Sequence, residues 1–243
     1  MKRKRRTSNA KRKQTKRKKR RTTTFTPSRE TNRTAVLNHN VGLLSPHKIV
    51  SMRYADTHEI TSSVGPTVGG GALRLNGIFD PDTALGGGQP RGHDQMNLYY
   101  NKYKVLSCTI TVRFKNMSAT SQNGKPYMCL AFPGANFNDW VGLSSRDVME
   151  RYPGFYKTVN TQLGSTTIKW TWSGKKWFDK SDWESEFTTA LFGADPSKQA
   201  FLNLGVIPVE KSDPGYLVPA VLAVTTMDFK VMLFDPKPVL LES

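Results

Sequence analysis

The chain has 243 residues, 37% of them hydrophobic, and a formal net charge of +17 at pH 7. This length can form one large β domain or two small domains, and the hydrophobic residues, which include five tryptophans, are enough for a buried core. The longest uncharged apolar run, residues 216–227, is short and contains a proline, and no apolar segment follows the charged N-terminus. The composition therefore predicts neither membrane insertion nor a secretory signal.

The positive charge is concentrated at the N-terminus. Residues 1–21 hold 14 of the 36 Lys and Arg and no acidic residue, so the remainder of the chain carries a formal charge of only +3. A solvated surface usually mixes charges of both signs, so we expect polyanion binding rather than a simple solubility arm. The predicted nucleic-acid-binding residues are Lys2, Arg3, Lys4, Arg5, Arg6, Lys11, Arg12, Lys13, Lys16, Arg17, Lys18, Lys19, Arg20 and Arg21.

These cations alternate without aromatic residues, the first of which is Phe25, so the segment lacks side chains that stack on bases. It is expected to hold nucleic acid without reading its sequence. The same clusters match a nuclear-localisation signal, and composition alone does not separate the two roles. A Thr-rich stretch with Pro27 follows, and we predict a disordered arm and linker over residues 1–40 and one folded body over residues 41–243.

After residue 46 the hydrophobic pattern has a period of two, which is typical of half-buried strands. Residues 104–114 place Leu106, Cys108, Ile110, Val112 and Phe114 on one face, and residues 168–174 place Ile168, Trp170 and Trp172 inward. Further strand candidates lie at residues 48–62, 72–79, 126–132, 200–209 and 216–234. Turn residues separate these runs, which favours an antiparallel sandwich or jelly roll over a parallel sheet.

Helix signals are few and short. Ser144 lies three residues before Asp147 and predicts a capping box, and Ser181 before Glu184 offers a second one. Residues 92–103 could form about two helical turns. The body is therefore expected to be all-β, with short helices in its loops.

No arrangement of residues predicts catalysis, a cofactor or a metal centre. His39, His47, His58 and His93 do not fall at ligand or triad spacing, and the neighbours in the pairs His58-Glu59 and His93-Asp94 would point to opposite faces of a strand. Asp80 and Asp82 could offer oxygen ligands, but without a third acid nearby a turn is the favoured interpretation. Cys108 and Cys129 are expected to be buried reduced thiols, with a disulfide between neighbouring strands as the alternative.

One stretch carries a family resemblance. Residues 79–106 read FDPDTALGGGQPRGHDQMNLYYNKYKVL, and this segment resembles the loop and following strand in capsid proteins of circovirus-like, circular single-stranded DNA viruses that encode a replication-initiator protein. In that family the loop precedes a Tyr-x-x-Tyr helix. Gly88 departs from the pattern, which commonly has histidine before Gln-Pro. The matching positions, expected to contact neighbouring subunits, are Asp80, Pro81, Asp82, Gln89, Pro90, Gly92, Asp94, Gln95, Tyr100 and Tyr103.

The resemblance implies a single eight-stranded antiparallel jelly roll that assembles as a homo-oligomer into a sixty-subunit (T=1) icosahedral shell around single-stranded DNA. It also implies a virion protein that passes through the host nucleus, with a host nuclear import receptor and an unidentified cell-surface receptor as partners. Aromatic residues assigned to loops would suit subunit contacts: Phe137, Trp140, Phe155, Tyr156, Trp177 and Trp183. The alternatives are the coat protein of a small RNA satellite virus and a ribosomal or chromatin-type nucleic-acid-binding protein.

Overall fold

The computed structural model describes residues 44–60, 69–84, 88–117, 126–159, 164–209 and 220–238. The chain divides into two units, Met1–His39 and Asn40–Ser243, and all described residues belong to the second unit. The expected arm of residues 1–40 lies outside the described residues.

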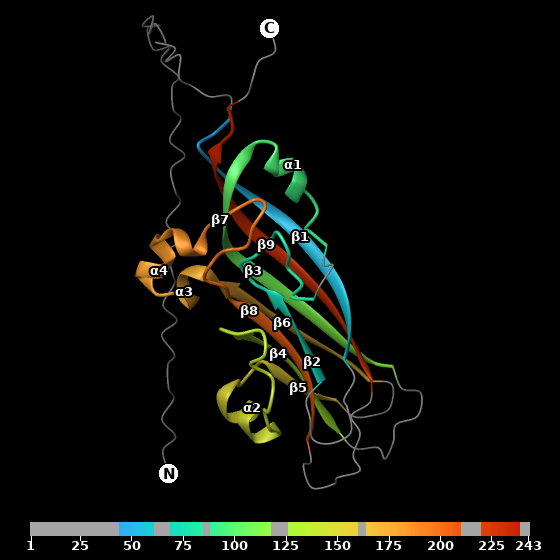
Figure 1. Cartoon of the computed structure of the whole chain (residues 1–243). Helices are drawn as coiled ribbons and strands as arrows, with labels where there is room; N and C mark the ends of the chain where they lie inside the picture. Colours follow the sequence, from blue (N-terminus) through green and yellow to red (C-terminus); the bar gives the residue numbers. More distant parts are fainter. Residues whose placement is uncertain are drawn as a thin grey trace, which may run out of the picture. The chain divides into compact units, whose positions relative to one another are not determined.

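The second unit is built from two antiparallel sheets (Figure 1). The first sheet contains β1 (His47–Ile60), β3 (Tyr100–Asn116), β6 (Ser165–Ser173), β9 (Val221–Pro236) and the two-residue β7 (Ala190–Leu191). The second sheet contains β2 (Gly69–Arg74), β4 (Tyr127–Gly134), β5 (Tyr156–Val159) and β8 (Phe201–Pro208).

The strand order identifies the fold. The four long strands of the first sheet run β1-β9-β3-β6, with β7 beside β3, and the second sheet runs β2-β8-β4-β5. Strands from the two ends of the chain are thus hydrogen-bonded neighbours, as in the in-register pairing of β1 with β9 from His47 opposite Phe234 to Ile60 opposite Val221. Eight principal strands interleaved between two sheets in this order form a jelly roll. The expected all-β, eight-stranded antiparallel fold is confirmed.

The helices are short and lie in the connections, as expected. They are α1 (His93–Asn97), α2 (Ser145–Arg151), α3 (Gly174–Trp177), α4 (Lys180–Glu184) and the 3-10 helix η1 (Glu186–Thr188). None of the described helices is long and apolar enough to cross a membrane.

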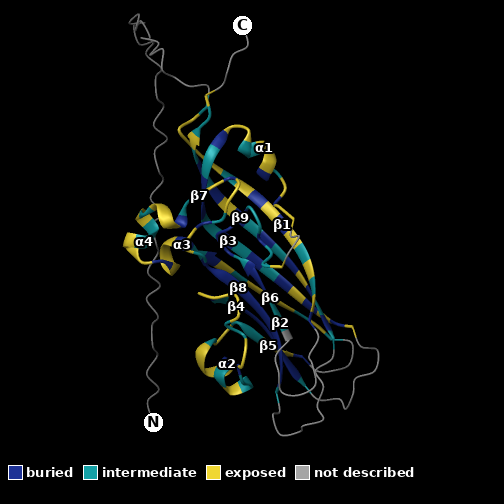
Figure 2. Ribbon diagram, viewed as in Figure 1, coloured by how far each residue is buried: buried dark blue, intermediate teal, exposed yellow. Residues whose placement is uncertain are grey.

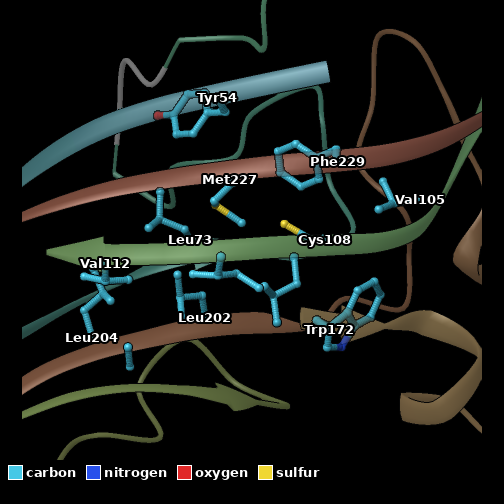
Figure 3. Packing of buried hydrophobic residues seen from close by; sticks show 14 of the residues in the cluster. Tyr54, Leu73, Val105, Cys108, Val112, Trp172, Leu202, Leu204, Met227 and Phe229 are labelled. Carbon is cyan, nitrogen blue, oxygen red and sulfur yellow. The ribbon is translucent and has the colours of Figure 1, made fainter. Parts of the chain in front are cut away.

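The main core lies between the two sheets. Buried side chains alternate with exposed ones along β1, β6 and β9, whereas β4 and β8 are buried almost throughout (Figure 2). Cys108 and Val112 from β3 belong to the same buried cluster as Leu202 and Leu204 from β8, and Figure 3 shows part of this cluster. A second, smaller cluster forms under α2 around Phe132, which explains why β4 is buried on both faces.

One predicted strand face changes within β3. Cys108, Ile110, Val112 and Phe114 are buried as expected, but Leu106 is only partly buried, and Val105 takes the core position. The pairing of β3 with β9 shifts register between Val105 and Ser107. A β-bulge inserts one extra residue and so reverses the alternation. The assignment of Leu106 to the core face was wrong for this reason.

Of the two predicted capping boxes, one is confirmed. Ser144 accepts a hydrogen bond from the Asp147 backbone N–H, and the Asp147 carboxylate accepts one from the Ser144 N–H at 3.0 Å, so α2 begins with a complete box. The second prediction was wrong, because α4 begins after Asp179 and Ser181 lies inside it. Ser185 instead caps η1 by accepting from the Phe187 N–H.

Candidate assembly surface

Eight of the ten motif residues expected to contact neighbouring subunits lie between β2 and β3, in two described parts, residues 80–82 and 89–95. Arg74, at the end of β2, organises the first part. Its Nη1 donates hydrogen bonds to the backbone carbonyls of Asp80 (2.5 Å) and Asp82 (2.8 Å), and its Nε lies 3.3 Å from the Asp195 carboxylate. A guanidinium offers several donors in a fixed plane, so one side chain can hold this loop against the segment before β8.

Asp195, the ion-pair partner of Arg74, has a shifted pKa because it is partly buried. Desolvation of its carboxylate raises its pKa, and the Arg74 charge opposes that shift. The loop is therefore attached by a partly buried ion pair rather than by a surface contact. Pro81 is buried behind it, while Asp82 forms an isolated β-bridge with Leu73.

The second part of the loop leads into α1. Pro90 is buried, and the backbone N–H of Arg91 donates to the carbonyl of Arg53 on the edge strand β1. Gly92, the N-cap of α1, has φ 96°, a left-handed conformation that strongly favours glycine. A glycine at this motif position is thus required by the turn. Gln89, Asp94 and Gln95 remain exposed and form the part of the motif available to a partner.

Tyr100 and Tyr103 do not lie on a helix. The helix α1 ends at Asn97, and both tyrosines are buried residues of β3. The Tyr100 hydroxyl donates to the Ser45 carbonyl (3.1 Å), whereas the Tyr103 hydroxyl donates to the Ala194 carbonyl (2.9 Å) and accepts from the Ile78 N–H (3.3 Å). The helix expected over residues 92–103 is confirmed only in its first part, α1, because β3 pairs with β9 from Tyr100 onwards. Both residues support the loop from inside the subunit.

One of the two histidine pairs differs from the sequence-based expectation. His93 and Asp94 lie on α1 rather than on a strand, and His93 Nδ1 is 3.0 Å from Asp94 Oδ1. The His93 ring is buried against Phe192, with ring centroids 5.1 Å apart. His58 lies on β1 and contacts Asp82 rather than its neighbour Glu59. The opposite-face argument therefore holds for His58-Glu59, which lie on a strand, and fails for His93-Asp94, which lie on a helix.

Four of the six aromatic residues expected at subunit contacts are partly buried within the subunit. Phe137 and Trp177 are exposed, but Trp140, Phe155 and Tyr156 pack partly buried against the α2 cluster. Trp183 packs against the main core, and Lys104 Nζ lies 4.3 Å from its ring centroid. Trp140 covers Gly70 of β2, where an added Cβ would come within 2.5 Å of the indole. These rings stabilise the loops of the subunit itself.

Other apolar side chains take the exposed positions. Leu98 is 70% exposed, Val141 61% and Leu191 56%. Leu98 lies between α1 and β3, and Leu191 lies on β7, which pairs with β3. Val141, like the exposed Phe137, lies in the loop before α2. The sequence gives no signal for these residues, because each has an aromatic neighbour in the chain: Tyr99, Trp140 and Phe192. Only the structure separates them from apolar residues that pack inward.

The described surface carries charges of both signs. Arg53 on β1 pairs with Asp228 on β9 at 2.6 Å, and Arg146 pairs with Glu150 along α2 at 2.8 Å. Exposed pairs of this kind contribute little to stability, but they keep the potential of the body near neutral. The predicted cationic residues of 1–21 lie outside the described residues, so their role stays a prediction.

Two further groups bear on chemistry, and the second of them includes Asp82 of the loop. Cys108 and Cys129 are free buried thiols, and burial raises the pKa of each. Among the described residues, one group has the make-up of a metal site: ligand atoms of Asp56, His58 and Asp82 all lie within 4.8 Å of one another. The sequence-based expectation of no metal ligand rested on the lack of a third acid near Asp80 and Asp82. The fold supplies Asp56 at that place.

No protein-family model and no curated protein matches this chain. Solved structures with a similar arrangement include the decameric BFDV capsid protein, at TM-score 0.41 and 11% identity, covering 78% of this chain and 99% of that chain. Mud crab tombus-like virus is similar at TM-score 0.44 and 13% identity, covering 80% and 92%. The semi-empty virus-like particle of Macrobrachium rosenbergii nodavirus is similar at TM-score 0.40 and 11% identity, covering 79% and 96%.

Proposed function

We propose that this chain is the coat protein of a small virus, which assembles into a sixty-subunit (T=1) icosahedral shell and packages circular single-stranded DNA through its basic arm. The observation that carries the proposal is the joining of a jelly roll to a segment that holds 14 cations and no anion. Jelly rolls occur in capsid, lectin and cupin proteins, and of these only a capsid uses an arm that gathers a polyanion.

The charge distribution supports self-assembly. With a formal charge of only +3 outside residues 1–21, copies of the body can approach one another without strong repulsion. Exposed Leu98, Leu191 and Val141 offer apolar contact area to a neighbouring subunit. A ribosomal or chromatin-type protein, in contrast, would be expected to spread its basic residues over the folded body.

The arm supplies the genome-binding charge. Sixty arms of 14 cations each would bring about 840 positive charges to the interior, enough to neutralise on the order of a kilobase of single strand. Binding of this kind does not distinguish DNA from RNA, so the choice of DNA rests on the motif of residues 79–106. The coat protein of a small RNA satellite virus is the alternative within the same class.

Location follows from this role. The protein would be found in the virion, and in the host nucleus during assembly, where the basic clusters would engage a nuclear import receptor. Attachment to a new cell would require a cell-surface receptor, which the exposed loops of the shell would contact. The role is structural rather than catalytic.

The test is negative-stain electron microscopy of the purified full-length protein, with the ratio of absorbance at 260 to 280 nm read on the same fraction. We expect uniform particles that carry nucleic acid sensitive to deoxyribonuclease. A variant lacking residues 1–29 should still self-associate but lose the nucleic acid, and a Leu98→Asp/Leu191→Asp variant with an intact arm should bind nucleic acid without forming particles.

Other outcomes separate the alternatives. Particles whose nucleic acid is digested only by ribonuclease would favour the RNA virus. A monomer that binds nucleic acid and forms no particles over a range of salt and pH would support a cellular nucleic-acid-binding protein. Full nucleic-acid binding by the truncated variant would disprove the role of the arm.

A further inference from the structure

Three potential metal ligands meet at the edge of the sandwich. Asp56 and His58 are two residues apart on β1, so their side chains lie on the same face of that strand, and Asp82 lies in the loop after β2. His58 Nε2 is 3.4 Å from Asp82 Oδ1, and the side chains of His58 and Asp82 are 17% and 13% exposed. The group therefore lies mostly within the protein rather than on its open surface.

The group joins the two sheets. β1 is the edge strand of one sheet and β2 is the edge strand of the other. The His58 ring lies over Gly71 of β2, where an added Cβ would be 3.5 Å from its Cδ2 atom. A single ion bound by these residues would thus hold β1 to the loop that follows β2.

The two carboxylates are already oriented by hydrogen bonds. Asp56 accepts bonds of 2.7 Å from the Tyr54 hydroxyl and from the Thr57 backbone N–H, and Asp82 accepts one of 3.0 Å from the Ala84 N–H. Each carboxylate oxygen still has a lone pair to offer. Hydrogen bonds to ligand carboxylates are a regular feature of metal sites, because they fix the ligands before the ion binds.

The contact between His58 and Asp82 is long for a hydrogen bond. Good N–H···O bonds measure about 2.7–3.2 Å, whereas the observed distance is 3.4 Å. Two ligand atoms bound at about 2.0–2.2 Å to one tetrahedral ion lie about 3.3–3.6 Å apart. The other ring nitrogen, His58 Nδ1, is buried without a hydrogen-bond partner among the described residues. The imidazole therefore has no short hydrogen bond at either ring nitrogen among the described residues, and an ion at Nε2 would satisfy the nitrogen that faces Asp82.

Negative charge is concentrated around this point. Asp56 and Asp82 belong to the group itself, and Asp80 lies two residues before Asp82 in the same loop. Arg74 is the nearby cation, but its guanidinium is shared with Asp80 and Asp195. Asp80 Oδ1 is also buried without a partner in the described part of the chain. A bound cation would relieve this repulsion.

We propose that Asp56, His58 and Asp82 bind a divalent transition-metal ion of the zinc type, with water in the fourth position. One imidazole and two carboxylates suit Zn²⁺, whereas Ca²⁺ and Mg²⁺ prefer sites made of oxygen ligands alone. The ion joins β1 to the 80–84 segment and so stabilises the base of the exposed motif loop. This inference does not depend on the proposed coat function.

The test measures Zn²⁺ binding to the full-length protein in competition with a chromogenic chelator. His58→Gln and Asp82→Asn should each weaken Zn²⁺ binding at least tenfold. Two matched controls, His47→Gln on the same strand and the exposed Asp94→Asn, should bind as the wild type does. Binding of one Zn²⁺ per chain should raise the Tm of the wild type and of both controls but not that of the His58 variant.

Wild-type protein alone gives an independent measurement, which is needed if a ligand variant does not fold. Cobalt(II) should give the visible absorption of a tetrahedral site, and X-ray absorption at the zinc edge should show nitrogen and oxygen ligands with scattering from one imidazole. Zinc binding unchanged in His58→Gln, sulfur scattering, or no saturable binding of one ion per chain would each overturn the proposal. In that case Asp56 and His58 are inward-pointing polar residues that protect an edge strand from pairing. Saturable Ca²⁺ binding that Zn²⁺ does not displace would overturn the choice of metal.

Discussion

The indole N–H of Trp170 in β6 donates a hydrogen bond of 3.0 Å to the backbone carbonyl of Ala131 in β4, and this bond joins the two sheets of the sandwich. The ring also packs edge-on against Phe155, with centroids 5.1 Å apart. A residue that sequence periodicity identifies only as facing inward therefore has a specific polar partner in the other sheet.

Replacing Trp170 with phenylalanine should destabilise the protein. The change keeps an aromatic ring but leaves the Ala131 carbonyl without this donor, which costs about 1–3 kcal/mol. The free energy of unfolding, followed by circular dichroism in denaturant, measures the effect. Trp177→Phe is the control, because Trp177 is exposed and should change the free energy by less than about 0.5 kcal/mol. Equal effects of the two substitutions would contradict the role of the hydrogen bond.

The helix caps give a second prediction. Ser144→Ala removes one half of the capping box of α2 and should cost about 0.5–2 kcal/mol in the free energy of unfolding. Ser181→Ala removes a serine that the sequence pattern also places at a cap but that lies inside α4, so it should be close to neutral. Thermal or denaturant unfolding of the two variants distinguishes them. A larger loss for Ser181→Ala would mean that α4 begins elsewhere.

Tyr103→Phe tests the internal support of the motif loop. Its hydroxyl bridges the Ile78 N–H and the Ala194 carbonyl inside the protein, so removing it should cost about 1–3 kcal/mol. Hydrogen exchange at residues 78–84 should become faster in the variant. The neighbouring Tyr99→Phe provides the control, because Tyr99 is exposed and its loss of a hydroxyl should change neither quantity. Unaltered stability of Tyr103→Phe would rule out this bridging role.

The buried thiols predict a dependence of stability on pH. Burial raises the pKa values of Cys108 and Cys129 above the unfolded value of about 8.5, so the folded state keeps these protons while the unfolded state loses them. The free energy of unfolding should therefore be unaffected by these groups below pH 8 and fall as the pH rises above about 8.5. Urea titrations between pH 7 and 10 measure this loss, and a Cys108→Ala/Cys129→Ala variant should lose less over the same range.

Alkylation provides the matching chemical measurement. Both thiols should resist iodoacetamide at pH 8.5 in the native protein and react fully in denaturant, because the native thiols are buried and protonated. An exposed cysteine introduced by Ser197→Cys serves as the reactive control. Rapid native labelling of Cys108 or Cys129 would show that the core opens far more often than its burial indicates.

The arm gives a prediction in cells. Alanine in place of every Lys and Arg in residues 2–6 and 11–21 should abolish nuclear accumulation of a fluorescent fusion, because import receptors recognise clustered cations. A matched variant with the same charges but with the two clusters exchanged in order should still enter the nucleus. Nuclear accumulation of the alanine variant at the wild-type level would exclude the arm as the import signal.

The sequence by itself determined the strand content and the placement of charge. Alternation of apolar and polar residues is a local property, so residues 168–172 could be assigned an inward face without knowing their partners. The capping box of Ser144 could also be predicted from the sequence, because Ser144 and its partner Asp147 are three residues apart. The concentration of 14 cations within 21 residues needs no structure at all.

Only the tertiary structure decided which residues meet across the sandwich. The bulge at Leu106 arises from the register between β3 and β9, and no local pattern in either strand contains it. The same is true of Asp56 and Asp82, which are brought together because β1 and β2, the edge strands of the two sheets, lie next to each other. Side-chain periodicity sets which face a residue takes, but long-range strand pairing sets its neighbours, and binding sites consist of neighbours.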